Sequence, residues 1–161
     1  MSQSFGKQIK FYSDRLRGDK RTALDVQFVK SAGNDSFLTV NFTIAPFNEQ
    51  NSSVIWDEKV IIQLSRYELT QCCAVLFGLV KELRANFHGE GKNKGLTIIH
   101  NGPSGCGINI SDSGRVMTHM INHQQRIELG AFMLNRQSQA WDMSVSDVLA
   151  ILRQSMVIQR G

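Results

Sequence analysis

Apolar and polar residues alternate with period two in several short runs, and each run predicts a β-strand. The clearest covers residues 22–30, where Leu24, Val26 and Phe28 alternate with Asp25 and Gln27. The other runs lie at residues 8–13, 37–45, 60–64, 96–100, 106–111 and 116–120, with a weak strand around Phe87. Short polar turns separate most of the strands, so we expect antiparallel pairing between neighbours.

The strand at residues 60–64 leads directly into the strongest helix signal. Ser65 and Glu68 have the spacing of a capping box, in which each side chain bonds the other residue's backbone N–H. Apolar residues then recur at helical spacing at Leu69, Cys72, Cys73, Leu76, Val80 and Leu83. The pattern predicts an amphipathic helix that ends near Arg84, where a basic side chain suits the negative end of the helix dipole.

The same layout occurs again in residues 115–140. Val116, Thr118 and Met120 alternate with other residues and lead into a second capping signal, formed by Asn122 and Gln125. One helical face then carries Ile127, Gly130, Ala131 and Leu134. We therefore predict an α+β fold of two tandem β-β-β-β-α units, with two antiparallel sheets and the helices packed between them.

We expect one domain over residues 1–161, with units at 1–86 and 87–141 and an extra C-terminal helix in 142–161. Ser144 and Asp147 resemble a capping box for this last helix. Its apolar stripe is Val148, Leu149, Leu152 and Met156. A helix of this length is marginal alone in water, so it should dock on the body of the protein or on another subunit.

Composition is ordinary for a globular protein, with 42% hydrophobic and 20% charged residues. No apolar run approaches the roughly 20 residues that cross a bilayer, and the N-terminus has no apolar core like that of a secretory signal. Three cysteines, Cys72, Cys73 and Cys106, suit a reducing compartment as small buried side chains. We expect a cytoplasmic, nucleoid-associated protein.

Positive charge is concentrated near the N-terminus, although the net charge is only +4. Residues 7–30 contain seven Lys and Arg side chains and three Asp side chains. Such a segment is typical of a surface that binds a polyanion. The alternative is a solvated hairpin whose basic side chains protect an edge strand from aggregation.

Catalytic and metal-binding motifs are missing from the sequence. Gly102-Pro103-Ser104-Gly105 does not have the spacing of a nucleophile elbow, and residues 89–95 lack the Gly-Lys-Ser/Thr end of a phosphate-binding loop. His119 and His123 span a strand end and a helix cap without a third ligand nearby. We therefore expect no enzymatic activity, no cofactor and no metal.

Aromatic residues near the basic segment favour binding to unpaired nucleic acid. Tyr12, Phe37 and Trp56 are expected at sheet positions close to Lys10 and Lys59. Basic groups hold a phosphate backbone while aromatic faces stack on bases, at roughly 1–3 kcal/mol per base. Each ring also has a structural alternative, since Tyr12 and Phe37 could serve only to pack the sheet.

Several short motifs resemble the Whirly family of single-stranded-DNA-binding proteins. Residues 19–24, Asp-Lys-Arg-Thr-Ala-Leu, are similar to the family's Lys-Gly-Lys-Ala-Ala-Leu strand motif. Asp19 and Lys20 replace its first Lys and its Gly. Trp56-Asp57-Glu58-Lys59 resembles the Trp-x-x-Lys strand, and Phe87-His88 and Trp141 also lie where the family would place them.

The resemblance implies two four-stranded sheets, each followed by a helix, with the helices packed at the centre of a homotetramer. Part of this fold is shared with transcription coactivators of the positive-cofactor-four type. It also implies sequence-tolerant binding of single-stranded DNA along sheet edges, in replication, recombination, repair or transfer. Residues expected to hold phosphates are Lys7, Lys10, Arg17, Lys20, Arg21, Lys59, Lys92 and Lys94, and those expected to stack on bases are Tyr12, Phe37 and Trp56.

Two alternatives stay open beside this function. The first is RNA binding by a protein of the same fold, because no reader of the 2′-hydroxyl can be identified in a sequence. The second is a scaffold that docks a protein partner on the apolar stripe of the C-terminal helix.

Overall fold

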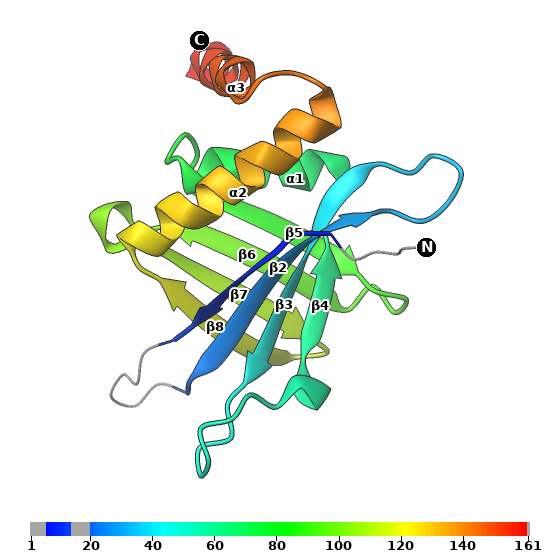
Figure 1. Ribbon diagram of the computed structural model, residues 1–161, viewed down its shortest axis with the longest axis vertical. Coiled ribbons are helices and arrows are strands. Elements are labelled where there is room, and N and C mark those ends of the chain that lie inside the picture. Colours follow the sequence, from blue (N-terminus) through cyan, green and yellow to red (C-terminus); the bar gives the residue numbers. More distant parts are fainter. Residues whose placement is uncertain (1–5, 14–19, 161) are drawn as a thin grey trace.

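The computed structural model describes residues 6–13 and 20–160, and these residues form two four-stranded antiparallel sheets and three α-helices (Figure 1). The first sheet contains β1 (Gln8–Tyr12), β2 (Thr22–Lys30), β3 (Leu38–Pro46) and β4 (Val60–Gln63). The second contains β5 (Glu82–His88), β6 (Lys94–His100), β7 (Cys106–Asp112) and β8 (Arg115–Ile121). The α+β class and the two antiparallel sheets are confirmed.

In both sheets the strands are arranged in chain order, so that each strand pairs with the next. Helix α1 (Arg66–Leu76) follows the first sheet, while α2 (His123–Trp141) and α3 (Val145–Arg160) follow the second. Two short 3-10 turns, η1 (Trp56–Glu58) and η2 (Gly102–Ser104), precede β4 and β7. The boundary expected between residues 86 and 87 lies inside β5.

A single hydrophobic cluster joins the two sheets and the helices. The strands of the two sheets cross each other, and their inward faces meet where β8 lies beside β2 and β3 (Figure 1). Helices α1 and α2 pack against each other, and each contacts strands of both sheets. The three cysteines are buried in this cluster as free thiols. Among the described residues, no helix is long and apolar enough to span a bilayer.

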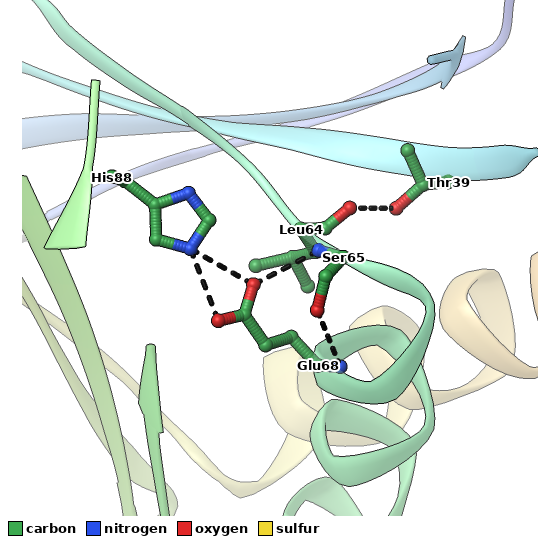
Figure 2. Close-up of polar contacts among 5 residues, drawn as sticks. All are labelled: Thr39, Leu64, Ser65, Glu68 and His88. Atoms are coloured by element: carbon green, nitrogen blue, oxygen red, sulfur yellow. Dashed lines mark hydrogen bonds and ion pairs between the residues drawn. The ribbon is translucent and has the colours of Figure 1, made fainter. Parts of the chain in front are cut away.

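Both capping boxes form as predicted, and one of them links the two units. The Ser65 hydroxyl accepts a hydrogen bond from the Glu68 N–H, and the Glu68 carboxylate accepts one from the Ser65 N–H. The same carboxylate lies 2.9 and 3.0 Å from Nε2 of His88 on β5 (Figure 2). At α2, Asn122 and Gln125 make the equivalent pair of bonds. The start of α1 is therefore fixed to the first strand of the second sheet.

The predicted end of the first helix, near Arg84, is wrong. Helix α1 ends at Leu76, because Gly78 adopts the left-handed conformation (φ 72°) that closes a helix. The Gly78 N–H donates to the Val75 carbonyl and the Leu79 N–H to the Ala74 carbonyl, which is the bond pattern of a Schellman cap. The residues beyond it enter β5, the weak strand expected around Phe87.

In the second unit the buried positions match the apolar patterns of the sequence only in part, since Gly130 and Leu134 are buried but Ile127 and Ala131 are exposed. On β8 the exposed residues include Val116 and Met120, whereas Met117, His119 and Ile121 are buried. Helix α2 likewise exposes Ile127 and Ala131; its buried face carries Leu129, Gly130, Met133 and Leu134. Both sets of β8 positions contain apolar side chains, so alternation alone does not decide which set faces the core.

The C-terminal helix docks on the body of the protein, the first of the two arrangements expected for it. Val148 and Leu152 belong to the hydrophobic cluster, and Met156 is also buried. The hydroxyl of Ser144 accepts the Asp147 N–H at 3.1 Å, which gives α3 its N-terminal cap. The stripe expected to dock a partner is therefore covered mainly by the chain itself.

Candidate nucleic-acid interface

A groove of about 970 Å³ lies at the junction of the two sheets. Its walls come from the end of β1, the start of β2, the segment around η1, the edge strand β8 and the first turn of α2. Figure 1 shows β8 beside β2 at this junction. The volume lies within the range of sites that bind small molecules or single groups of a larger ligand.

Strand alternation places Lys10 and Tyr12 on the outer face of the first sheet, while Phe11 enters the core. Tyr12 lies opposite Ala23 on β2, and Ala23 lies opposite Ala45 on β3. Both alanines are fully buried, so larger groups cover this part of the outer face. The turn η1 contacts β3 at this end of the sheet.

The structure pairs cations with aromatic rings along this surface. Nζ of Lys10 lies 4.9 Å from the ring centroid of Trp56. The guanidinium of Arg21 lies 4.1 Å from the centroid of Phe47, and the rings of Tyr12 and Phe47 meet edge to face at 6.2 Å. Four predicted binding residues, from three segments of the chain, thus lie on one surface together with Phe47.

The rings differ in their accessibility to a ligand. Tyr12 is 49% exposed and Trp56 is partly exposed, so both can offer ring surface. Phe47 is only 9% exposed, because its ring supports Arg21 and Tyr12. Trp56 was expected at the start of a strand but lies in η1, and β4 begins at Val60. In η1 the backbone carbonyl of Trp56 accepts the Lys59 N–H at 3.1 Å, and the Lys59 side chain is exposed.

Charges around the groove are mixed with a positive excess. Lys20, Arg21 and Arg115 line it together with Glu49 and Glu58. Arg115 is paired with Glu58, whose carboxylate oxygen lies 3.5 Å from Nη2. Lys20 is exposed, and the Arg21 Nε–H donates to the Ser13 carbonyl. The groove can therefore hold an anionic ligand on Lys20 and Arg21.

A buried polar contact lies directly below the groove. The Thr22 hydroxyl lies 2.8 Å from Nδ1 of His119 and 3.1 Å from the Thr118 carbonyl, joining β2 to β8. Burial lowers the pKa of His119 to about 4, although the contact with Thr22 acts in the opposite direction. Nε2 of His119 has no hydrogen-bond partner among the described residues. The imidazole is therefore neutral near pH 7 and joins the two sheets.

The other predicted residues are not assembled at the groove. The Lys7 carbonyl accepts the Phe28 N–H, well away from Tyr12 along β1. Phe37 lies just before β3, beneath the guanidinium of Arg66 at 5.0 Å, whereas the groove residue Phe47 follows the end of that strand. Lys92 and Lys94 belong to the β5–β6 connection and the start of β6. Arg17 lies outside the described residues.

Sequence reasoning missed Phe47 and Arg115 as members of this surface. Phe47 directly follows Pro46, the last residue of β3, and its bridge to Val54 closes the loop that leads to η1. An aromatic residue at the end of a strand carries a weak signal of its own. Arg115 begins β8, and only the contact between the two sheets brings it near Glu58.

The arrangement has features that are suited to ligand binding. It combines exposed ring surface, cations and a groove, and among the described residues no group of three or more His, Cys, Asp or Glu side chains is placed to hold a metal. Comparisons of the chain with protein-family models, with curated proteins and with solved structures found no match.

Proposed function

We propose that the protein binds single-stranded DNA with little sequence preference and acts in replication, recombination, repair or transfer. The observation that carries the proposal is the clustering of Lys10, Tyr12, Arg21 and Trp56 at one end of the first sheet, beside the groove. Cations hold phosphates and exposed rings stack on bases. In a duplex the base faces are already stacked on one another, so such a surface favours unpaired strands.

The proposal includes Whirly-type architecture and assembly. Two successive four-stranded sheets, each followed by a helix, support the architecture. Exposed apolar side chains support a homotetramer, because unpaired apolar surface favours association; the proposed nucleoid location follows from the proposed binding of DNA. On the helices and at the end of α1 these include Tyr67, Phe77, Ile127, Ile151 and Ile158. Light scattering at several protein concentrations tests the subunit number.

Removing exposed cations should weaken binding and make the affinity less dependent on salt concentration. Each lost phosphate contact on a single strand lowers the slope of log affinity against log salt by about 0.7. For the double variant Lys20→Ala/Lys59→Ala we expect a slope lower by about 1.4, measured by fluorescence titration with a dT oligonucleotide. Lys81→Ala is the matched control, because Lys81 is an exposed lysine directly before β5 that belongs neither to the groove lining nor to the η1 segment beside Trp56. An unchanged slope in the double variant would contradict phosphate binding at these two lysines.

Removing the Trp56 ring should weaken binding without changing the salt slope, because stacking releases no counterions. For Trp56→Ala we expect roughly tenfold weaker binding, within the range for loss of one stacked base. Trp56→Phe keeps a ring and should lose less. Trp141→Phe alters the other tryptophan, in α2, and should bind as the original protein does. A Trp56→Ala variant with unchanged affinity and an intact fold would refute stacking at this position.

A further inference from the structure

Phe87 is an aromatic side chain displayed at a strained point of an edge strand. It is 76% exposed and has a positive φ of 64°, which is unusual for a bulky residue. The strand pairing shifts register between Ala85 and His88, so Phe87 lies in a β-bulge of β5. Strained positions of this kind cluster at ligand-binding sites, and bulges re-aim side chains.

The contact between His88 and Glu68 holds this bulge in place. Figure 2 shows the His88 ring turned toward Glu68, whose carboxylate also caps α1. Both side chains are mostly buried. With His88 fixed inward, the neighbouring Phe87 ring remains in solvent. The protein thus maintains a strained, exposed ring by means of a buried polar contact.

A shallow hollow of about 520 Å³ adjoins the bulge. It lies between the outer face of the first sheet and the end of β5, and its lining includes Phe37, Asn41, Gln63, His88 and Gly89. Oδ1 of Asn41 is buried and has no hydrogen-bond partner among the described residues. Buried polar atoms are nearly always paired in folded proteins, so an unpaired acceptor beside a hollow indicates a place for a ligand donor.

Two cations lie beside lining residues of the hollow: Arg66 at Phe37, and Lys94, which is opposite His88 on β6 and next to Gly89. The guanidinium of Arg66 covers the Phe37 ring, and its side chain is 63% exposed even though it pairs with Asp35 at 3.6 Å. Lys92 and Lys94 follow Phe87 in the turn and in β6. An aromatic ring, an unpaired acceptor and nearby cations match the three parts of a nucleotide: the base face, the base edge and the phosphate.

We propose that this hollow holds an unpaired base of the same DNA strand, with Phe87 stacking on it and Asn41 accepting a hydrogen bond from its edge. This inference rests on the proposed function and adds a second contact site. Each of the four bases has an N–H group on its pairing edge, so one acceptor does not impose a sequence. Asn41 and the groove residue Phe47 are six residues apart along β3 and its end, roughly 20 Å, so the bound DNA crosses the first sheet along that strand.

The substitution Phe87→Asn tests this site without damaging the fold. Asn adopts the left-handed conformation more readily than Phe, so the variant should melt at the same temperature or higher. Binding to a long dT oligonucleotide should fall about tenfold, as expected for loss of one stacked base. Phe87→Trp should retain affinity. Ser52→Gly is the control, because it relieves a positive φ of 57° without removing a ring and should leave affinity unchanged.

Cross-linking gives an independent measurement. A dT oligonucleotide carrying 5-iododeoxyuridine should cross-link, under ultraviolet light, to peptides containing Phe87 or Phe37 and also to peptides containing Tyr12 or Trp56. Unchanged affinity of Phe87→Asn, with cross-links confined to the groove, would overturn the second site and leave the proposed function standing. If the unmodified protein binds no single strand at low salt, both fail. A Phe87→Asn variant that changes only self-association would make this ring a protein contact instead.

Discussion

Replacing Arg136 by alanine should lower the free energy of unfolding by about 3–5 kcal/mol. The side chain is only 8% exposed and fixes α2 to the first sheet. Its guanidinium donates to the Thr39 carbonyl at 2.9 Å, to the Val29 carbonyl at 2.6 Å and to the Gln139 side chain at 2.8 Å. Val29 and Thr39 are opposite each other on β2 and β3, so one side chain bridges two strands.

The large effect follows from the groups that the substitution leaves behind. Two backbone carbonyls lose a charged donor, and the guanidinium also lies 4.6 Å from the Phe28 ring, so packing is lost as well. Burial lowers the pKa of Arg136, which reflects the cost of keeping this charge inside the protein. Arg136→Lys should lose less, because it keeps a charged donor but cannot reproduce the planar fork.

Urea denaturation of the variant measures this change. Arg153→Ala is the matched control, since Arg153 is exposed on α3 and should change stability by less than about 0.5 kcal/mol. A loss of under about 1 kcal/mol in Arg136→Ala would mean that the two hydrogen bonds to β2 and β3 do not hold α2 on the sheet.

Acidification from pH 7 to pH 5 should destabilise the protein by about 2 kcal/mol through His119 alone. The folded pKa is about 4, because burial at the junction of β2 and β8 disfavours the imidazolium, whereas the unfolded value is near 6.5. Between about pH 6.5 and pH 4, His119 is therefore protonated in the unfolded chain but stays neutral in the folded chain. This contribution is fully present above pH 6.5 and declines until the pH reaches about 4.

The variant His119→Gln isolates this effect, because it removes the titrating group and leaves all carboxylates in place. The stability of the original protein should fall more steeply between pH 7 and pH 5 than that of the variant, whatever their difference at pH 7. Parallel stability curves over this range would show that His119 is not the residue that senses acid. Thr22 contacts both His119 and Thr118, and the two threonines line the groove. Protonation of His119 should therefore also destabilise this wall of the proposed binding site.

Elements with strong local signals were predicted well from the sequence. Strand β2 has the predicted bounds, Thr22–Lys30, because its alternation is regular and turns flank it. The two capping boxes depend on residues three positions apart, so they too can be recognised locally. The predicted end of α1 was wrong because the local pattern is misleading there. Val80 and Leu83 continue the helical period in the sequence, but Gly78 ends the helix before it reaches them.

The candidate site could be predicted only in part, because it depends on contacts between distant segments. Basic and aromatic residues near β1 were recognised from composition and alternation. Their pairing was not, since the approach of Lys10 to Trp56 depends on how η1 folds against β3. The exposed position of Phe87 could not be predicted from the sequence for the same reason. Its exposure follows from a bulge that forms when His88 turns toward Glu68, a contact between the two units.

Electrophoretic mobility shifts with a dT oligonucleotide, the matching duplex and an rU oligonucleotide, each at low and at high salt, test the proposed function most directly. We expect the dT oligonucleotide to shift at low salt, to bind less tightly at high salt and to be preferred over the duplex. Tighter binding of rU would assign the surface to RNA instead. If dT fails to shift and leaves tryptophan fluorescence unchanged at low salt, the protein is not a single-stranded-DNA-binding protein.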